Sequence, residues 1–182
     1  MNIKKYSIIG FIFTVILGTL LHFAYDFFNQ NLVIGYFSAV NESTWEHLKL
    51  LITPILIFTI IEYFLYGSEI DNFIIVKALS ILLGMIAIVS FFYTYTGIIG
   101  KNFLPLDILT FIFGVFVSYY FSYKMLNTKY FYRENSNYIG FFIFFILVFC
   151  MIYFTTNPPQ IKLFLDPVTN TYGIPEWFFK YC

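Results

Sequence analysis

Residues 41–49, which read Asn-Glu-Ser-Thr-Trp-Glu-His-Leu-Lys, form the densest cluster of ionisable and hydrogen-bonding side chains in the sequence. An apolar run, residues 50–66, follows directly. Ser43 and Glu46 have the spacing of a capping box, in which the hydroxyl accepts from a free N–H of the first helical turn and the carboxylate reaches back to the N–H of the cap residue. Asn41 is a second candidate cap. The pattern predicts a helix that begins inside the polar cluster.

Both histidines of the chain lie near an acid. His22 and Asp26 are four residues apart on one face of the preceding apolar run, and His47 directly follows Glu46 on the stripe that Ser43 shares. Imidazole and carboxylate groups bind zinc, manganese or iron, and a site with one open position can activate water. Antiparallel packing of the two helices would bring the pairs together. The sequence therefore predicts a possible divalent-metal cofactor with four candidate ligands: His22, Asp26, Glu46 and His47.

The same residues also fit a structural network, in which each imidazole hydrogen-bonds to an acid or a backbone carbonyl and holds the two helices together. No His-Glu-x-x-His motif occurs to favour the metal. Proton handling and direct contact with a ligand are further alternatives, and Lys49 can pair with Glu46. The polar pocket predicted under all these readings comprises His22, Asp26, Asn41, Glu42, Ser43, Glu46, His47, Lys49, Asp166 and Tyr172.

The composition is that of an integral membrane protein. Hydrophobic residues make up 60% of the 182 residues and charged residues only 11%, against about 25% charged in soluble domains. The formal net charge is zero, so nothing points to nucleic acid as a partner. Cys150 and Cys182 have no metal or redox spacing. The lipid bilayer is the predicted partner of most of the surface.

Five apolar runs have about the length that a spanning helix needs. We predict an all-α integral membrane bundle that forms a single domain over residues 1–182, because lipid offers no partner for free backbone groups. The predicted spans are residues 6–25, 44–66, 73–95, 104–123 and 138–156, followed by a proline-rich tail at 157–182. Residues 31–40 are too short to cross and too apolar for a loop in water. They are expected to lie in the interface or to dip back against the bundle.

Two further acids lie near the ends of spans. Glu62 is the deepest acid of the second span, and an ionisable group within a membrane is a functional candidate; the reading favoured from the sequence places it near the headgroups instead. Asp107 opens the fourth span, where an acid favours the positive end of the helix dipole. Lys101 is its candidate partner.

Lysine and arginine set the expected orientation. The basic residues on the N-terminal side of the bilayer outnumber those on the other side, and the densest basic loop, residues 124–133, lies on the first side. We therefore predict a multi-pass protein of the cell membrane with its N-terminus in the cytoplasm. Because five spans are an odd number, the C-terminus, the polar cluster and the tail are expected at the exterior.

The chain resembles a family of small, uncharacterised multi-pass membrane proteins of bacteria. The resemblance rests on the motif at residues 41–49, on His22 and Tyr25, and on the tail from Pro158-Pro159 to Tyr172-Gly173-Ile174. It covers most of the chain. It implies the multi-pass architecture and directs attention to these residues, but it implies no mechanism.

Three functional classes stay open. The first is binding, sensing or transport of a small or lipid-like ligand in the polar pocket. The second is a metal-dependent membrane enzyme that acts on a lipid or a cell-envelope substrate. The third is a structural partner of another membrane protein. The chain contains no Gly-x-Ser-x-Gly and no glycine-rich phosphate loop, which argues against a classical serine hydrolase or a nucleotide-binding protein.

Overall fold

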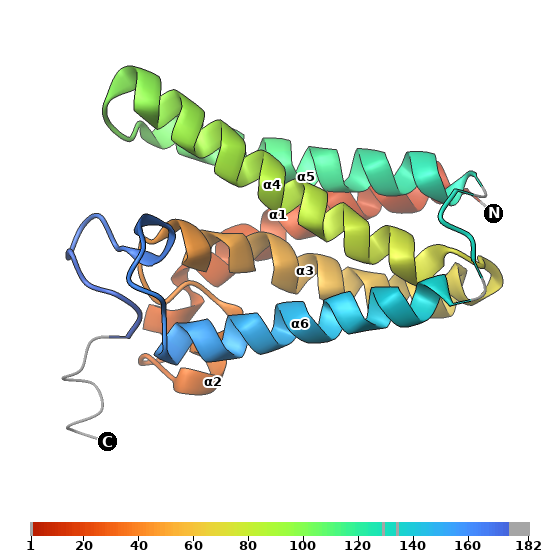
Figure 1. The fold of residues 1–182 in the computed structure, drawn as a ribbon, viewed down its shortest axis with the longest axis horizontal. Helices are drawn as coiled ribbons and strands as arrows, with labels where there is room; N and C mark the ends of the chain where they lie inside the picture. Colours follow the sequence, from red (N-terminus) through yellow and green to blue (C-terminus); the bar gives the residue numbers. More distant parts are fainter. Residues whose placement is uncertain (1, 129, 134, 175–182) are drawn as a thin grey trace.

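A computed structural model describes residues 2–128, 130–133 and 135–174 of the chain. Within these residues the fold is all-α, as predicted, and its long helices lie side by side in a bundle (Figure 1). Five helices are long and apolar enough to cross a membrane, which is consistent with a multi-pass membrane protein. They are α1 (Ile3–Phe27), α3 (Thr44–Leu65), α4 (Phe73–Ile99), α5 (Leu104–Leu126) and α6 (Ser136–Thr156).

The helix boundaries lie close to the ends of the apolar runs. Helices α3, α4 and α5 begin at residues 44, 73 and 104, and α6 ends at residue 156, where the corresponding predicted spans begin and end. Helix α4 is longer than its predicted span and continues to Ile99. It stops where Gly100 adopts a left-handed conformation with φ of 80°, which residues with a Cβ rarely adopt.

Helix α3 is the central helix of the bundle. It contacts α1, α4, α5 and α6, and also the short helix α2 (Leu32–Phe37). Apolar side chains from its first four turns form the centre of the main hydrophobic core: Trp45, Leu48, Leu51, Ile52, Ile55 and Phe58. The polar side chains of Lys49, Thr53, Thr59 and Glu62 in α3 are buried inside the bundle.

Helix α1 approaches both α3 and α5 along a stripe of small residues, a common way for membrane helices to pack closely. The stripe consists of Ser7, Gly10, Thr14 and Gly18. At Gly18 an added Cβ would lie 2.6 Å from the carbonyl oxygen of Leu50 in α3. That carbonyl lacks its helical donor because Pro54, four residues later, has no N–H. The contact fixes α1 against α3 one turn before His22.

The end of the bundle at which α1 ends and α3 begins is here called the site end. Asn31 caps α2 by accepting from the N–H groups of Val33 and Ile34, and α2 contacts α1, α3 and α6. Residues 31–40 therefore pack back against the bundle, one of the two predicted arrangements. Tail residues 157–174 also lie at the site end (Figure 1). Residues 175–182 of the predicted tail lie outside the described residues.

A buried ion pair joins α3 to α4 near the opposite end of the bundle. Glu62 is fully buried and pairs with Lys77 of α4. Its second carboxylate oxygen accepts a hydrogen bond from the Tyr66 hydroxyl at 2.5 Å. These two partners satisfy its charge inside the bundle, and its position near the headgroups stays a prediction.

Candidate functional site

Two imidazoles and one carboxylate meet at the site end. His22 of α1, Glu42 before α3 and His47 of α3 each offer a ligand atom, and these three atoms lie within 4.8 Å of one another. The Glu42 oxygens lie 3.8 Å from Nε2 of His22 and 3.5 Å from Nε2 of His47. The centroids of the two imidazole rings are 5.1 Å apart. The two histidines that the sequence placed in one pocket therefore come together, and Glu42 lies between them.

The start of α3 orients His47. The Ser43 hydroxyl accepts from the N–H of Glu46 at 3.3 Å, so Ser43 is the N-cap as predicted. The Ser43 carbonyl lies 2.9 Å from Nδ1 of His47, and a carbonyl can only accept, so Nδ1 carries the proton. The lone pair of the ring is then on Nε2, which faces Glu42. A histidine that binds a metal ion through one ring nitrogen usually donates a hydrogen bond from the other nitrogen, often to a backbone carbonyl.

Hydrogen bonds around Asn41 hold Glu42 in place. The Asn41 side-chain oxygen accepts from the N–H of Ser43 at 2.9 Å, and its amide nitrogen donates to the Gly173 carbonyl at 3.0 Å. Asn41 is therefore a turn and tail contact rather than a helix cap. Glu42 precedes the helix, so helical spacing gives no indication of its neighbours. Only its place in the polar cluster marked it as a pocket candidate. About half of its side chain is exposed, at 49%.

Glu46 is not among the three residues that converge, because it pairs with Lys49, although it still interacts electrostatically with His47. Its carboxylate is buried, pairs with Lys49 at 2.5 Å and accepts from the N–H of Val40 at 3.1 Å. Lys49 is also buried and donates to the Gly35 carbonyl and the Thr155 hydroxyl. The predicted pairing of Glu46 with Lys49 is thus present. The carboxylate half of the capping box is absent, because Lys49 draws Glu46 into the bundle.

The other predicted pocket residues occupy three different places. Asp26 is exposed at the end of α1 and interacts electrostatically with His22, but no described residue forms an ion pair with it. Asp166 is buried in the tail and accepts from the Val168 N–H and the Thr169 hydroxyl. Tyr172 packs against the main core and pairs with Leu165 in an isolated bridge. Asp166 and Tyr172 therefore shape the tail and do not line the imidazole cluster.

Asp107 is a neighbour of the cluster that the sequence assigned to the helix dipole, with Lys101 as its candidate partner. It lies in the first turn of α5 and interacts electrostatically with both His47 and Glu42. Its carboxylate accepts a hydrogen bond from the hydroxyl of Tyr95 in α4, and within the described residues no ion pair to Lys101 is present. The signal in the sequence was its position at the same membrane end as His22 and His47.

The dimensions of the cluster fit a metal ion. Zinc bonds of roughly 2.0–2.2 Å in tetrahedral geometry place neighbouring ligand atoms about 3.4 Å apart. The observed separations are 3.5 and 3.8 Å, each to a different Glu42 oxygen, and the three ligand atoms span up to 4.8 Å, so the side chains would draw together when an ion binds. Nδ1 of His22 is buried and has no hydrogen-bond partner among the described residues. The cluster is therefore not a fully satisfied hydrogen-bond network.

Comparison with known proteins gives a family and no activity. A family model described as "Family of unknown function (DUF6512)" matches residues 1–174. No curated protein and no solved structure matches the chain.

Proposed function

We propose that this chain, which belongs to the DUF6512 family, binds a divalent metal ion through His22, Glu42 and His47. The observation that carries the proposal is the convergence of these three ligand atoms within 4.8 Å. Two histidines and one carboxylate suit zinc, manganese or iron(II). Such a set leaves coordination positions open to water or to a ligand. The ion thus gives the predicted binding pocket a defined occupant.

The partial exposure of the cluster supports access for the ion. The side chains of His22 and His47 are 29% and 37% exposed. The supporting hydrogen bonds at His47 and Asn41 hold the surrounding backbone without using the ligand atoms. A site held in this way loses little freedom when the ion binds, which favours affinity.

Hydrolysis of a lipid or cell-envelope substrate is a second candidate function. The observation that favours it is Asp107, a further acid close to the cluster whose hydrogen bond from Tyr95 holds it in place. A metal ion with an open position activates water, and a nearby carboxylate can accept the proton. Under this proposal Asp107→Asn lowers turnover of an ester lipid by roughly 100-fold, the usual size for a general base, while metal content is unchanged.

Elemental analysis of the purified protein tests the metal proposal. We expect close to one equivalent of zinc, manganese or iron in the wild type and a large loss in His22→Ala and in His47→Ala, because either change removes a ligand. Unfolding temperatures recorded on the same samples show whether the variants fold. A folded wild type that binds none of these ions at micromolar concentration contradicts the proposal and favours the structural role.

A further inference from the structure

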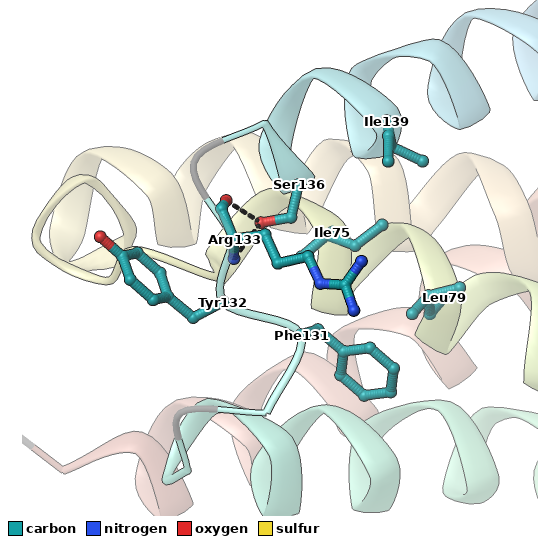
Figure 2. Close-up of a pocket in the computed structure, with 7 residues that line it drawn as sticks. All are labelled: Ile75, Leu79, Phe131, Tyr132, Arg133, Ser136 and Ile139. Atoms are coloured by element: carbon teal, nitrogen blue, oxygen red, sulfur yellow. Dashed lines mark hydrogen bonds between the residues drawn. The ribbon is translucent and has the colours of Figure 1, made fainter.

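A groove opens at the end of the bundle opposite the site end. Helix α4 packs against both α5 and α6, whereas α5 and α6 make no contact with each other within their described residues. A pocket of about 340 Å³ lies here beside α4, and its lining comes from α4, α6 and residues 131–133. Ile75 and Leu79 of α4 form its floor, Ile139 of α6 forms one wall, and residues 131–133 close its end (Figure 2). The groove thus has apolar sides and a polar end.

Arg133 supplies a positive charge at this polar end. Its side chain points into the groove toward Leu79, whereas Tyr132 points away (Figure 2). The Ser136 hydroxyl donates to the Arg133 carbonyl at 2.8 Å and accepts from its N–H at 3.2 Å, which fixes the backbone. Among the described residues no carboxylate pairs with the guanidinium. Within residues 2–128, 130–133 and 135–174 the guanidinium thus has no acidic partner that an anion would have to displace.

The groove floor continues along α4 toward the middle of the bundle. Residues 75, 79, 82 and 86 follow the helical period and are all aliphatic. Exposure rises along this face from Ile75, which is buried, to Ile86, which is 59% exposed. The face is about 16 Å long at 1.5 Å per residue, close to half of a bilayer core of roughly 30 Å. One acyl chain of one leaflet has this length.

We infer that this groove binds an anionic phospholipid, with its phosphate on the Arg133 guanidinium and one acyl chain along α4. The planar guanidinium binds phosphate oxygens in pairs. Basic residues at the end of an apolar inter-helix groove are a known arrangement for anionic headgroups. The apolar face of α4 favours a phospholipid over a free phosphate ion. A free phosphate would bind the Arg133 guanidinium but would leave the apolar face without a partner.

Native mass spectrometry of the full chain tests this inference. The protein is released from nanodiscs of phosphatidylcholine that contain a minor fraction of phosphatidylglycerol, and retained lipids are counted. We expect one retained phosphatidylglycerol in the wild type and roughly tenfold weaker retention in Arg133→Gln, since a charge-assisted contact is lost. Lys124→Gln is the matched control, because it removes an exposed positive charge at the same end that lies over the Tyr120 ring.

A second variant tests the apolar part of the groove. Ile139 is 56% exposed, so Ile139→Asn leaves the core intact and should also weaken retention. Addition of glycerol phosphate should not displace the lipid. Equal losses in Arg133→Gln and Lys124→Gln, or full retention in both Arg133→Gln and Ile139→Asn, would overturn the inference. Displacement by glycerol phosphate would also overturn it, because the site would then take a free anion.

Discussion

Glu46 and His47 are neighbours in the chain, yet their side chains leave α3 in different directions. The Glu46 carboxylate turns into the bundle toward Lys49, whereas His47 faces Glu42 and the imidazole of His22. Helical spacing predicted that the residues share a stripe. It did not predict the partner of each, because Lys49 is buried and any acid in reach of its ammonium is held there.

Removal of the buried cation should be costly. Lys49→Met leaves the Glu46 carboxylate buried without its partner, and we expect the free energy of unfolding to fall by about 3–5 kcal/mol. Unfolding in mixed detergent micelles measures the change. The double variant Lys49→Met with Glu46→Gln should recover much of the loss because no isolated charge remains. A Lys49→Met protein as stable as one carrying Lys5→Met, a change at an exposed lysine, would show that the pair does not stabilise the fold.

At the scale of helices, glycines decide how closely neighbours approach. Gly140 of α6 lies against α4, where an added Cβ would be 2.7 Å from the backbone nitrogen of Ile75. Gly97, near the end of α4, has nothing within 4 Å of such a Cβ. The same substitution at these two positions should therefore have opposite effects.

We expect Gly140→Ala to reduce the free energy of unfolding by about 1–3 kcal/mol, because the backbone of α4 cannot yield without moving the helix. Gly97→Ala should be neutral or stabilise the protein by up to about 1 kcal/mol through helix propensity. Thermal unfolding of the two variants in one detergent compares them directly. A destabilised Gly97→Ala beside an unchanged Gly140→Ala would mean that the α4–α6 crossing is described incorrectly.

The helices could be predicted from the sequence because apolar runs of spanning length leave the backbone few alternatives. The site could be predicted only in part. His22 and His47 come together because both lie at the same end of adjacent antiparallel helices. Glu42 could not be assigned as their partner, since it precedes the helix and its direction depends on hydrogen bonds from Asn41 to the distant Gly173 carbonyl.

At the scale of the whole molecule, polar chemistry is concentrated at the two ends of an apolar bundle. The site end carries the imidazole cluster, and the opposite end carries Arg133 and its groove. Large apolar side chains are exposed on the outer surfaces of all five long helices, as a surrounding of lipid requires. The orientation of these ends in the membrane remains the prediction made from lysine and arginine.

Cys182 offers a direct test of that orientation. A cytoplasmic N-terminus and five spans place the C-terminus outside, so a membrane-impermeant maleimide should label Cys182 in intact cells. Cys150 lies within α6, and a Cys182→Ser variant should therefore remain unlabelled. Labelling that requires permeabilised cells would reverse the topology and place the imidazole cluster on the cytoplasmic side.

The measurement that tests the central claim most directly is a zinc titration of Glu42→Gln and Asp26→Asn beside the wild type. Each variant removes one acid at the site end: the Glu42 side chain is half exposed, and Asp26 is exposed. Only Glu42 lies between the imidazoles. We expect one equivalent bound by the wild type and by Asp26→Asn, and an affinity at least roughly tenfold lower in Glu42→Gln, since a ligand is lost. Equal affinities in the wild type and Glu42→Gln, or a loss confined to Asp26→Asn, would contradict the three-residue metal site.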